Sequence, residues 1–354
     1  MQLNDLDDDR LRMLAGLRPP EDVHAKVLSV YVDLDPATFG TQPARARQLG
    51  SLIDEADRLT RKDGLGHDAH VALRADLERV REYLRGDGFS AKGAHALAIF
   101  ACGPAGLFEA VRLPDAIPSR VVVEDRPWLD PLVGRPRRRR CLALVNRRTL
   151  RVLLDGPAGE LREVADLTDD VHGRHEQGGW SQARYQRSIE EDVRAHLERA
   201  AATLFELHRR APFDVLAVGA AHELWPEFER ALHSYLREHT IGRFDVEVEH
   251  ATPEEALDAA QPLLAADERR HVDRLLGRMQ AGIGTGDGAV AGFEPVRRAL
   301  DERRVQALLY DAGSEQQGLD RAISDALLQA AEVVALHERP ELGPLGGIAA
   351  VLRF

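Results

Sequence analysis

Cysteine is scarce in this 354-residue sequence, which contains only Cys102 and Cys141. The two residues lie in different predicted segments and show no CxxC or Cys/His spacing. The sequence therefore offers neither a disulfide framework nor a structural zinc site. We expect both cysteines to be small hydrophobic residues in the protein interior.

Long apolar runs are also missing. None approaches the roughly 20 residues that a membrane helix needs, and the first ten residues, MQLNDLDDDR, are acidic where a secretory signal is basic and then apolar. With 44% hydrophobic and 30% charged residues, the composition is that of a folded globular protein. We expect a cytoplasmic protein with no membrane association.

Positive charge is in deficit, because the formal net charge is −12, and this disfavours RNA binding by the chain as a whole. The distribution is uneven, however. Eight arginines and no acid lie between Arg135 and Arg151, which predicts a local basic surface. The alternative is a solvated linker followed by charges at the edges of strands.

The hydrophobic pattern predicts α/β architecture, of mixed α+β type, in three domains at 1–134, 135–280 and 281–354. For the first domain it predicts strands at 27–34, 95–102, 108–113 and 120–125, and helices at 43–62 and 68–85. The proline-rich stretch PWLDPLVGRPRRRR marks the first boundary.

The middle domain is predicted to be a mixed sheet with helices on its faces. Strands are expected at 141–146, 149–154, 159–167, 213–220 and 244–250, and helices at 188–210, 222–238 and 253–280. Residues 168–186 lose all apolar periodicity and predict a long polar loop.

Five glycines between Gly282 and Gly292 lack a complete phosphate-binding or dinucleotide-binding pattern, so we expect a flexible connection there. The third domain is predicted to be rich in βαβ units. Its helices are expected at 294–303 and 318–330, and its strands at 305–311, 332–338 and the final stretch GGIAAVLRF.

The polar loop carries GGWSQARYQR before a long helix, which resembles the GGQSxxRxxR loop of archaeal and eukaryotic release factors. Gly178, Gly179, Ser181, Arg184 and Arg187 match that consensus. Trp180 stands where the catalytic glutamine would be, and Gln182 follows two residues later. This displaced glutamine is similar to that of bacterial relatives and of the eukaryotic peptidyl-tRNA hydrolases that rescue stalled large ribosomal subunits.

The carboxyl-terminal LGGIAAVLRF is similar to the ending of release factors and Pelota, and VLSVYVDLDP is similar to the opening of bacterial members. The chain thus resembles a bacterial branch of the release-factor and Pelota superfamily over essentially its whole length. The resemblance implies a ribonuclease-H-like middle domain and a release-factor-like third domain. It does not imply stop-codon reading, because the first domain shows no NIKS motif.

Peptide release requires water to attack an ester carbonyl. A glutamine amide is no general base, but it can orient water and donate a hydrogen bond. By the resemblance, Gln182 would position the water, while Gly178 and Gly179 would let the backbone approach closely because they lack a Cβ. The alternative is an exposed connection in which the glycines merely supply flexibility.

Candidate RNA contacts lie in the same segment and in the basic stretch. Trp180 could stack on a nucleobase or pack on its own domain. Phosphate contacts are predicted for Arg174, Arg184 and Arg187, which could instead pair with Glu176, Glu190 or Glu191. In the basic stretch, the candidates are Arg137, Arg138, Arg139 and Arg140, with the solvated linker as their alternative.

Two other chemistries fit the residues poorly. His172 and His175 lack a third metal ligand nearby, and Ser181 lacks a GxSxG elbow. We therefore expect no metal, no cofactor and no serine nucleophile.

Three functions follow as hypotheses. The resemblance implies a codon-independent rescue factor that hydrolyses peptidyl-tRNA, with ribosomal RNA and P-site tRNA as partners and with elongation factor Tu or another translational GTPase as a further one. An alternative is a non-catalytic hibernation factor that occupies the ribosomal A site. A third is a plain RNA-binding or protein-interaction module.

Overall fold

The computed structural model describes residues 4–5, 8–20, 24–34, 42–61, 66–85, 95–113, 116–133, 138–156, 160–169, 182–312, 314, 316–337 and 339–354. These residues form three β-sheets together with α-helices, which confirms the predicted mixed α/β fold class. The chain forms two compact units: unit 1 holds Met1–Pro136 and Arg274–Phe354, and unit 2 holds Arg137–Asp273. The division into three domains stays a prediction.

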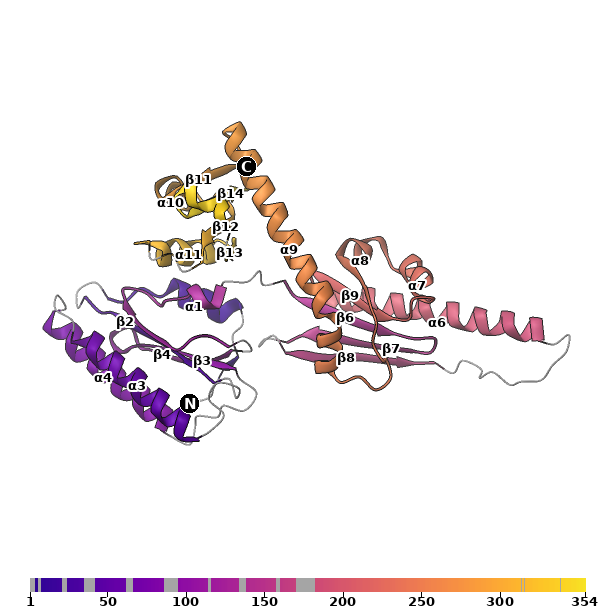
Figure 1. Cartoon of the computed structure of the whole chain (residues 1–354), viewed down its shortest axis with the longest axis horizontal. Coiled ribbons are helices and arrows are strands. Elements are labelled where there is room, and N and C mark those ends of the chain that lie inside the picture. Colours follow the sequence, from indigo (N-terminus) through magenta and orange to yellow (C-terminus); the bar gives the residue numbers. More distant parts are fainter. Residues whose placement is uncertain are drawn as a thin grey trace. The chain divides into compact units, whose positions relative to one another are not determined.

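The first sheet of unit 1 has the strand order β1-β4-β3-β2-β5 (Figure 1). Its strands are β1 (Asn4–Asp5), β2 (Val27–Asp33), β3 (Ala96–Cys102), β4 (Leu107–Leu113) and β5 (Arg120–Glu124). The helices α3 (Gln42–Thr60) and α4 (His67–Arg85) cover one face, since Leu52 and Leu73 share a core with Leu28. The central strand of this sheet, β3, is apolar and buried throughout because both of its faces are covered.

The second sheet of unit 1 has the order β11-β14-β12-β13. Its strands are β11 (Ala289–Ala291), β12 (Val305–Asp311), β13 (Glu332–Leu336) and β14 (Ile348–Leu352), and its helices are α10 (Phe293–Asp301) and α11 (Leu319–Leu328). Helix α1 (Asp8–Gly16) packs against α11. One hydrophobic core includes α1, Tyr31 and Phe100 of the first sheet, Leu308 of the second sheet and Ile323 of α11.

Three short elements complete unit 1: α5 (Asp130–Val133) and the 3-10 turns η1 (Gly103–Ala105) and η2 (Pro340–Leu345). The glycine-rich stretch is not the flexible connection predicted from the sequence. Helix α9 (Pro253–Thr285) continues through Gly282 and Gly284, and β11 follows. A glycine is required at 282 because a Cβ there would lie 2.7 Å from Ala289 N.

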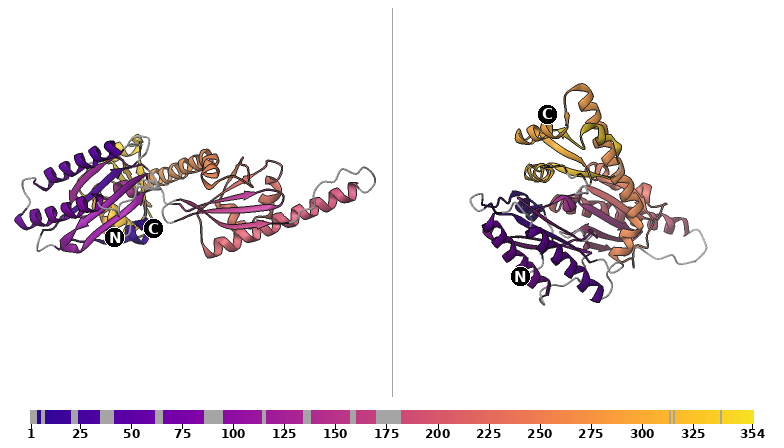
Figure 2. Two further views of the ribbon diagram at one scale, coloured as in Figure 1. Left: turned by 90° about the horizontal axis from the view of Figure 1, so that it is seen from below. Right: turned by 60° about the vertical axis from the view of Figure 1, so that its left-hand side comes forward.

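Unit 2 is built on a sheet of order β10-β9-β6-β7-β8 (Figures 1 and 2). Its strands are β6 (Arg140–Val145), β7 (Thr149–Asp155), β8 (Leu161–Thr168), β9 (Val215–Ala220) and β10 (Thr240–Phe244). Strands β6, β9 and β10 run parallel, and β7 and β8 are antiparallel to their neighbours. Helix α6 (Gln182–Arg210) packs on one face and α9 on the other.

Two elements of unit 2 differ from the prediction. The helix expected at 222–238 is divided into α7 (Trp225–Ala231) and α8 (Ser234–His239), because Leu232 is extended and His233 caps α8. The strand expected at 244–250 ends at Phe244 instead. Val246 and Val248 alternate with acidic residues because the two valines pack into the core. This alternation has the period of a β-strand, although the residues do not belong to the described strand β10.

Both cysteines are confirmed as free and buried. Burial raises the pKa of each thiol, so neither has the thiolate character of a reactive cysteine.

We expect Gly219→Ala to destabilise unit 2. A Cβ at this position would lie 2.5 Å from Val246 Cγ1 and 2.8 Å from Leu144 Cδ2. Overpacking of this kind costs roughly 1–3 kcal/mol, which would be measured as a lower midpoint of urea unfolding. The control is Gly277→Ala, at an exposed helical position with nothing within 4 Å of the added methyl. Equal midpoints for Gly219→Ala and the wild type would contradict the packing.

The half-buried Asp320, in the first turn of α11, gives a prediction on pH. Burial first, and then the charges of Glu124 and Asp130, raise its pKa from an ordinary 3.8 to about 6. The folded state therefore binds the proton more tightly, and stability present at low pH is lost as the pH rises from about 4 to about 6.

We therefore expect Asp320→Asn to raise the melting temperature at pH 7.5, with a gain that shrinks as the pH is lowered from 6 toward 4. Thermal scans across this range would measure it, with the exposed Asp258→Asn as control. A gain that does not change with pH would rule out the titration of Asp320 as its cause.

Candidate functional site

The predicted functional segment begins at one edge of the unit 2 sheet. The carboxyl ends of β6, β8, β9 and β10 meet there, because Val145 pairs with Ala220, Gly219 with Phe244, and Thr149 with Thr168. We call this the loop edge and define it as residues 146–149, 168–169 and 245–250. Of the described residues, Asp169 is the last before the segment that contains Gly178 and Gly179.

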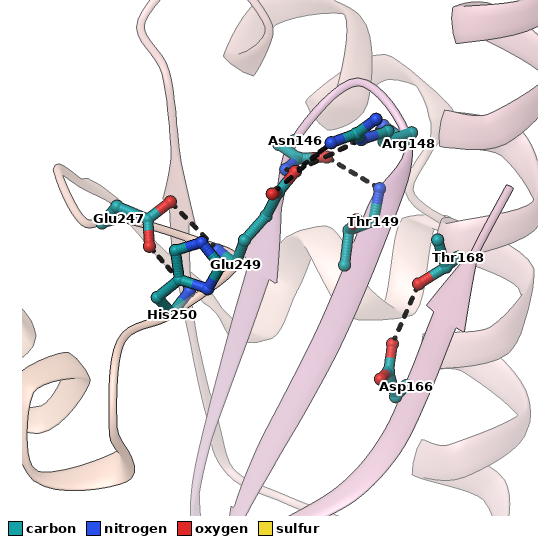
Figure 3. A network of polar contacts seen from close by, with 8 residues as sticks. All are labelled: Asn146, Arg148, Thr149, Asp166, Thr168, Glu247, Glu249 and His250. Carbon is teal, nitrogen blue, oxygen red and sulfur yellow. Dashed lines mark hydrogen bonds and ion pairs between the residues drawn. The ribbon is translucent and has the colours of Figure 1, made fainter. Parts of the chain in front are cut away.

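A tight turn between β6 and β7 organises the loop edge (Figure 3). The side-chain oxygen of Asn146 accepts hydrogen bonds from the backbone amides of Arg148 (2.9 Å) and Thr149 (2.7 Å). Its amide group donates to Glu249 Oε1 at 3.1 Å, and the guanidinium of Arg148 lies 3.1 Å from the same oxygen. The hydrogen bonds from Arg148 and then Asn146 lower the pKa of Glu249. The carboxylate thus joins the turn to the segment after β10.

The segment 245–250 is held by its own acid and by one arginine. Glu247 accepts hydrogen bonds from the amides of Glu249 (3.3 Å) and His250 (2.6 Å), as Figure 3 shows. On β7, Arg151 donates to the Val248 carbonyl at 3.0 Å and pairs with Glu163 of β8 at 2.6 Å. This hydrogen bond to Glu163 raises the pKa of Arg151. The irregular segment is therefore fixed to two strands.

Asp169 connects the loop edge to α6. Its backbone amide donates to the Arg148 carbonyl at 2.8 Å. Its carboxylate accepts a hydrogen bond from His196 Nδ1 at 2.6 Å and lies 2.9 Å from Arg199 NH2. The hydrogen bond from His196 is the main cause that lowers the pKa of Asp169. We call Asp169, His196 and Arg199 the base clamp, since they tie the end of β8 to the helix.

His196 is fully buried, and its two ring nitrogens have different surroundings. Because a carboxylate can only accept, the Nδ1 atom carries the proton, and Nε2 is buried with no hydrogen-bond partner among the described residues. A buried polar atom without a partner costs roughly 1–3 kcal/mol. The ring therefore has one satisfied orientation, with Nδ1 toward Asp169.

The amino-terminal turns of α6 extend beyond the strands (Figures 1 and 2). In the described part of α6, Val193 is the first buried residue, whereas Arg187 and Ser188 are exposed. At 1.5 Å per residue, Gln182 begins the helix roughly 16 Å before Val193. The sequence predicted that this helix would start at 188 and that 182–187 would belong to the loop. These residues are helical instead, because QARYQR contains no glycine or proline and is rich in helix formers.

Several predicted site residues cannot be placed. Arg137, Arg174, Gly178, Gly179 and Trp180 lie outside the described residues. Gln182 and Arg184 are placed by their helical backbone alone.

The basic stretch divides between two edges of the sheet. Arg138 pairs with the buried Asp267, and Arg140 donates to Asp155 at 2.9 and 2.8 Å. Arg139 donates to the Pro212 carbonyl at 3.2 Å. These three lie at the start of β6, opposite the loop edge. At the loop edge, Arg147 is exposed and has no ion pair to any described residue.

The base clamp was not predicted from the sequence. Its one signal was a histidine within the apolar stripe of a helix, between Val193 and Leu197. In the described ranges, no group of three or more His, Cys, Asp or Glu side chains could hold a metal ion. No helix in that part of the chain is long and apolar enough to span a membrane.

We expect Asp169→Asn to loosen the attachment of β8 to α6, because the amide loses the charge that pairs with Arg199 and the optimal acceptor for His196. Hydrogen exchange measured by mass spectrometry should speed up in peptides covering 161–169, with a loss of roughly 1–2 kcal/mol in local protection. Peptides from β6 and β9 should be unchanged. The control is Asp166→Asn, whose carboxylate accepts a 3.4 Å hydrogen bond from Thr168. Unaltered exchange in Asp169→Asn would argue against the clamp.

Comparison with solved structures finds low sequence identity throughout. An archaeal translation termination factor, aRF1, is 17% identical, with 99% of each chain covered and a TM-score of 0.29. Archaeoglobus fulgidus Pelota is 17% identical over 73% of this chain and 79% of its own, with a TM-score of 0.37. A chain from a model of ribosome-bound archaeal Pelota and ABCE1 is 14% identical over 100% and 96%, with a TM-score of 0.46.

No curated protein sequence matches the chain. A family model does: residues 127–263 match the one described as Bacterial archaeo-eukaryotic release factor family 10. The matched residues cover most of unit 2, including the GGWSQARYQR segment, α6 and the base clamp. Over residues 127–263 the chain is therefore similar to the bacterial archaeo-eukaryotic release factor group.

Proposed function

We propose that this protein is a ribosome-associated translation factor that hydrolyses peptidyl-tRNA during ribosome rescue, independently of the codon. The observation that carries the proposal is the family match over 127–263, which contains the segment with Gly178, Gly179 and Gln182. Its partners would be ribosomal RNA and the P-site tRNA, together with elongation factor Tu or another translational GTPase.

The start of α6 supports the chemistry. The first amides of a helix lack partners within the helix and carry partial positive charge. No acidic residue lies in the first turn of α6, so nothing there offsets this charge. A developing oxyanion or an RNA phosphate is favoured at such a position.

Gln182, the first residue of α6, would orient the attacking water through its side-chain amide. Water would add to the ester carbonyl of peptidyl-tRNA, and the ribose oxygen would leave as the peptide is released as an acid. Gly178 and Gly179 would allow the backbone near the ester, because a Cβ would occupy that space.

The base clamp would serve as a positioning device. A side chain displaced by about 1 Å can reduce a rate by 10²-fold, so the direction in which 170–181 leaves the sheet matters. The contacts of Asp169 with His196 and Arg148 restrain that direction.

The arginines divide by their partners. Arg187 and Arg147 are exposed without ion pairs to described residues, and with Arg174, Arg184 and Trp180 they are the proposed RNA contacts. RNA binding by Arg137 and Arg139 also remains proposed. Arg138 and Arg140 would have to leave Asp267 and Asp155 to bind phosphate, so replacing them would also disturb the fold.

We expect Gln182→Ala to lower the rate of peptide release by tenfold or more while ribosome affinity stays within a few-fold. An interaction made only in the transition state affects kcat and leaves binding intact. Release from P-site peptidyl-tRNA would be measured on 50S and 70S particles, and binding by sedimentation. Gln186→Ala, four residues along the same helix, is the matched control.

A result in the other direction would select the second hypothesis. If the wild-type protein releases no peptide from any P-site complex and yet occupies idle ribosomes tightly, hydrolysis is excluded and a hibernation role remains.

A further inference from the structure

Three arginines converge on a single carboxylate in unit 1. Asp325 Oδ1 lies 3.4 Å from Arg18 NH2 and 3.4 Å from Arg126 NH1, and Asp325 Oδ2 lies 3.5 Å from Arg321 Nε. Arg18 follows α1, Arg126 follows β5, and Arg321 and Asp325 lie one turn apart on α11. Three separate segments therefore bring cations to one place.

The guanidinium groups are held in position by the fold. Arg18 NH1 donates to the carbonyls of Ala15 (2.7 Å) and Leu17 (2.9 Å) at the end of α1. The Arg126 side chain is only 18% exposed. The packing of α1 against α11 keeps Arg18 near Asp325. The cluster is thus partly organised before any ligand arrives, which lowers the entropy cost of binding one.

Among the described residues, Asp325 is the one carboxylate in ion-pair contact with these three guanidinium groups, and its single charge does not balance theirs. Charge-assisted hydrogen bonds are typically about 2.7–2.9 Å long, and all three contacts to Asp325 are longer. Burial and then the neighbouring charge of Arg126 lower the pKa of Arg18, which indicates electrostatic repulsion within the group. Some other ion pairs of unit 1 are shorter, such as Arg10 with Glu109 at 2.6 Å and Arg297 with Glu294 at 2.8 Å.

We propose that Arg18, Arg126 and Arg321 form a binding site for a phosphate group. A phosphate has more oxygens than a carboxylate, and each can accept from a different guanidinium fork. Bound beside Asp325, the phosphate would neutralise the excess positive charge. It would also accept hydrogen bonds from the guanidinium groups that lie 3.4–3.5 Å from the carboxylate. This site lies in unit 1 and does not depend on the function proposed for unit 2.

The phosphate could be free or part of an RNA backbone, and two probes distinguish these sources. Inorganic phosphate is titrated into the full-length protein at constant ionic strength, with binding followed by calorimetry and by the melting temperature. A short oligouridylate without terminal phosphates is titrated in parallel. Saturable binding of phosphate alone indicates a free anion, and tighter binding of the oligouridylate indicates RNA.

Two variants that change the charge of the cluster in opposite directions test the proposed site. Arg321→Gln removes an exposed cation and should weaken binding by fivefold or more. Asp325→Asn removes the internal anion that competes for the same donors, and it should tighten binding by fivefold or more. Arg297→Gln on α10 makes the same change in net charge outside the cluster and should leave the affinity unchanged.

The proposal is overturned if the wild type shows no saturable binding of either probe. It is also overturned if Arg297→Gln weakens binding as much as Arg321→Gln, because attraction would then depend on net charge alone. Circular dichroism verifies the fold of each variant. Should Asp325→Asn fail to fold, the comparison of Arg321→Gln with Arg297→Gln still decides the outcome.

Discussion

The hydrogen bond from buried His196 to Asp169 is the interaction on which the candidate site depends. It joins Asp169, directly after β8, to the middle of α6, and the GGWSQ sequence lies between these two residues in the chain. His196 is fully buried, and the hydrogen bond from its Nδ1 to Asp169 fixes the orientation of the ring. A functional site is held most precisely where its supporting side chains are fixed by packing and hydrogen bonds.

The two edges of the unit 2 sheet use arginine differently. At the start of β6, Arg138 and Arg140 are engaged with Asp267 and Asp155, so they connect the sheet to α9 and to the neighbouring strand β7. At the loop edge, Arg148 and Arg151 hold irregular backbone through Glu249 and the Val248 carbonyl. Much of the basic stretch is thus structural, and Arg147 is an exposed arginine of this stretch without an ion pair to a described residue.

Unit 1 contrasts with this arrangement. Its two sheets share a hydrophobic core. Some of its charged groups are only partly neutralised by their neighbours. Asp320 is raised in pKa by burial and by neighbouring acids, whereas Arg18, Arg126 and Arg321 exceed the single charge of Asp325. Groups held in unfavourable charge states are often sites where a proton or a ligand binds.

The sequence by itself determined most elements of regular structure and the resemblance to release factors, because period and motif are local properties. Strands such as 27–33 and helices such as α4 follow from apolar spacing alone. It misplaced β10, where Val246 and Val248 alternate for packing, and it could not predict the base clamp or the arginine cluster. Asp169 and His196 are 27 positions apart, and Arg18 and Asp325 are 307 apart. Only the tertiary structure brings such residues together, because their proximity arises from strand order and helix packing, which no local pattern encodes.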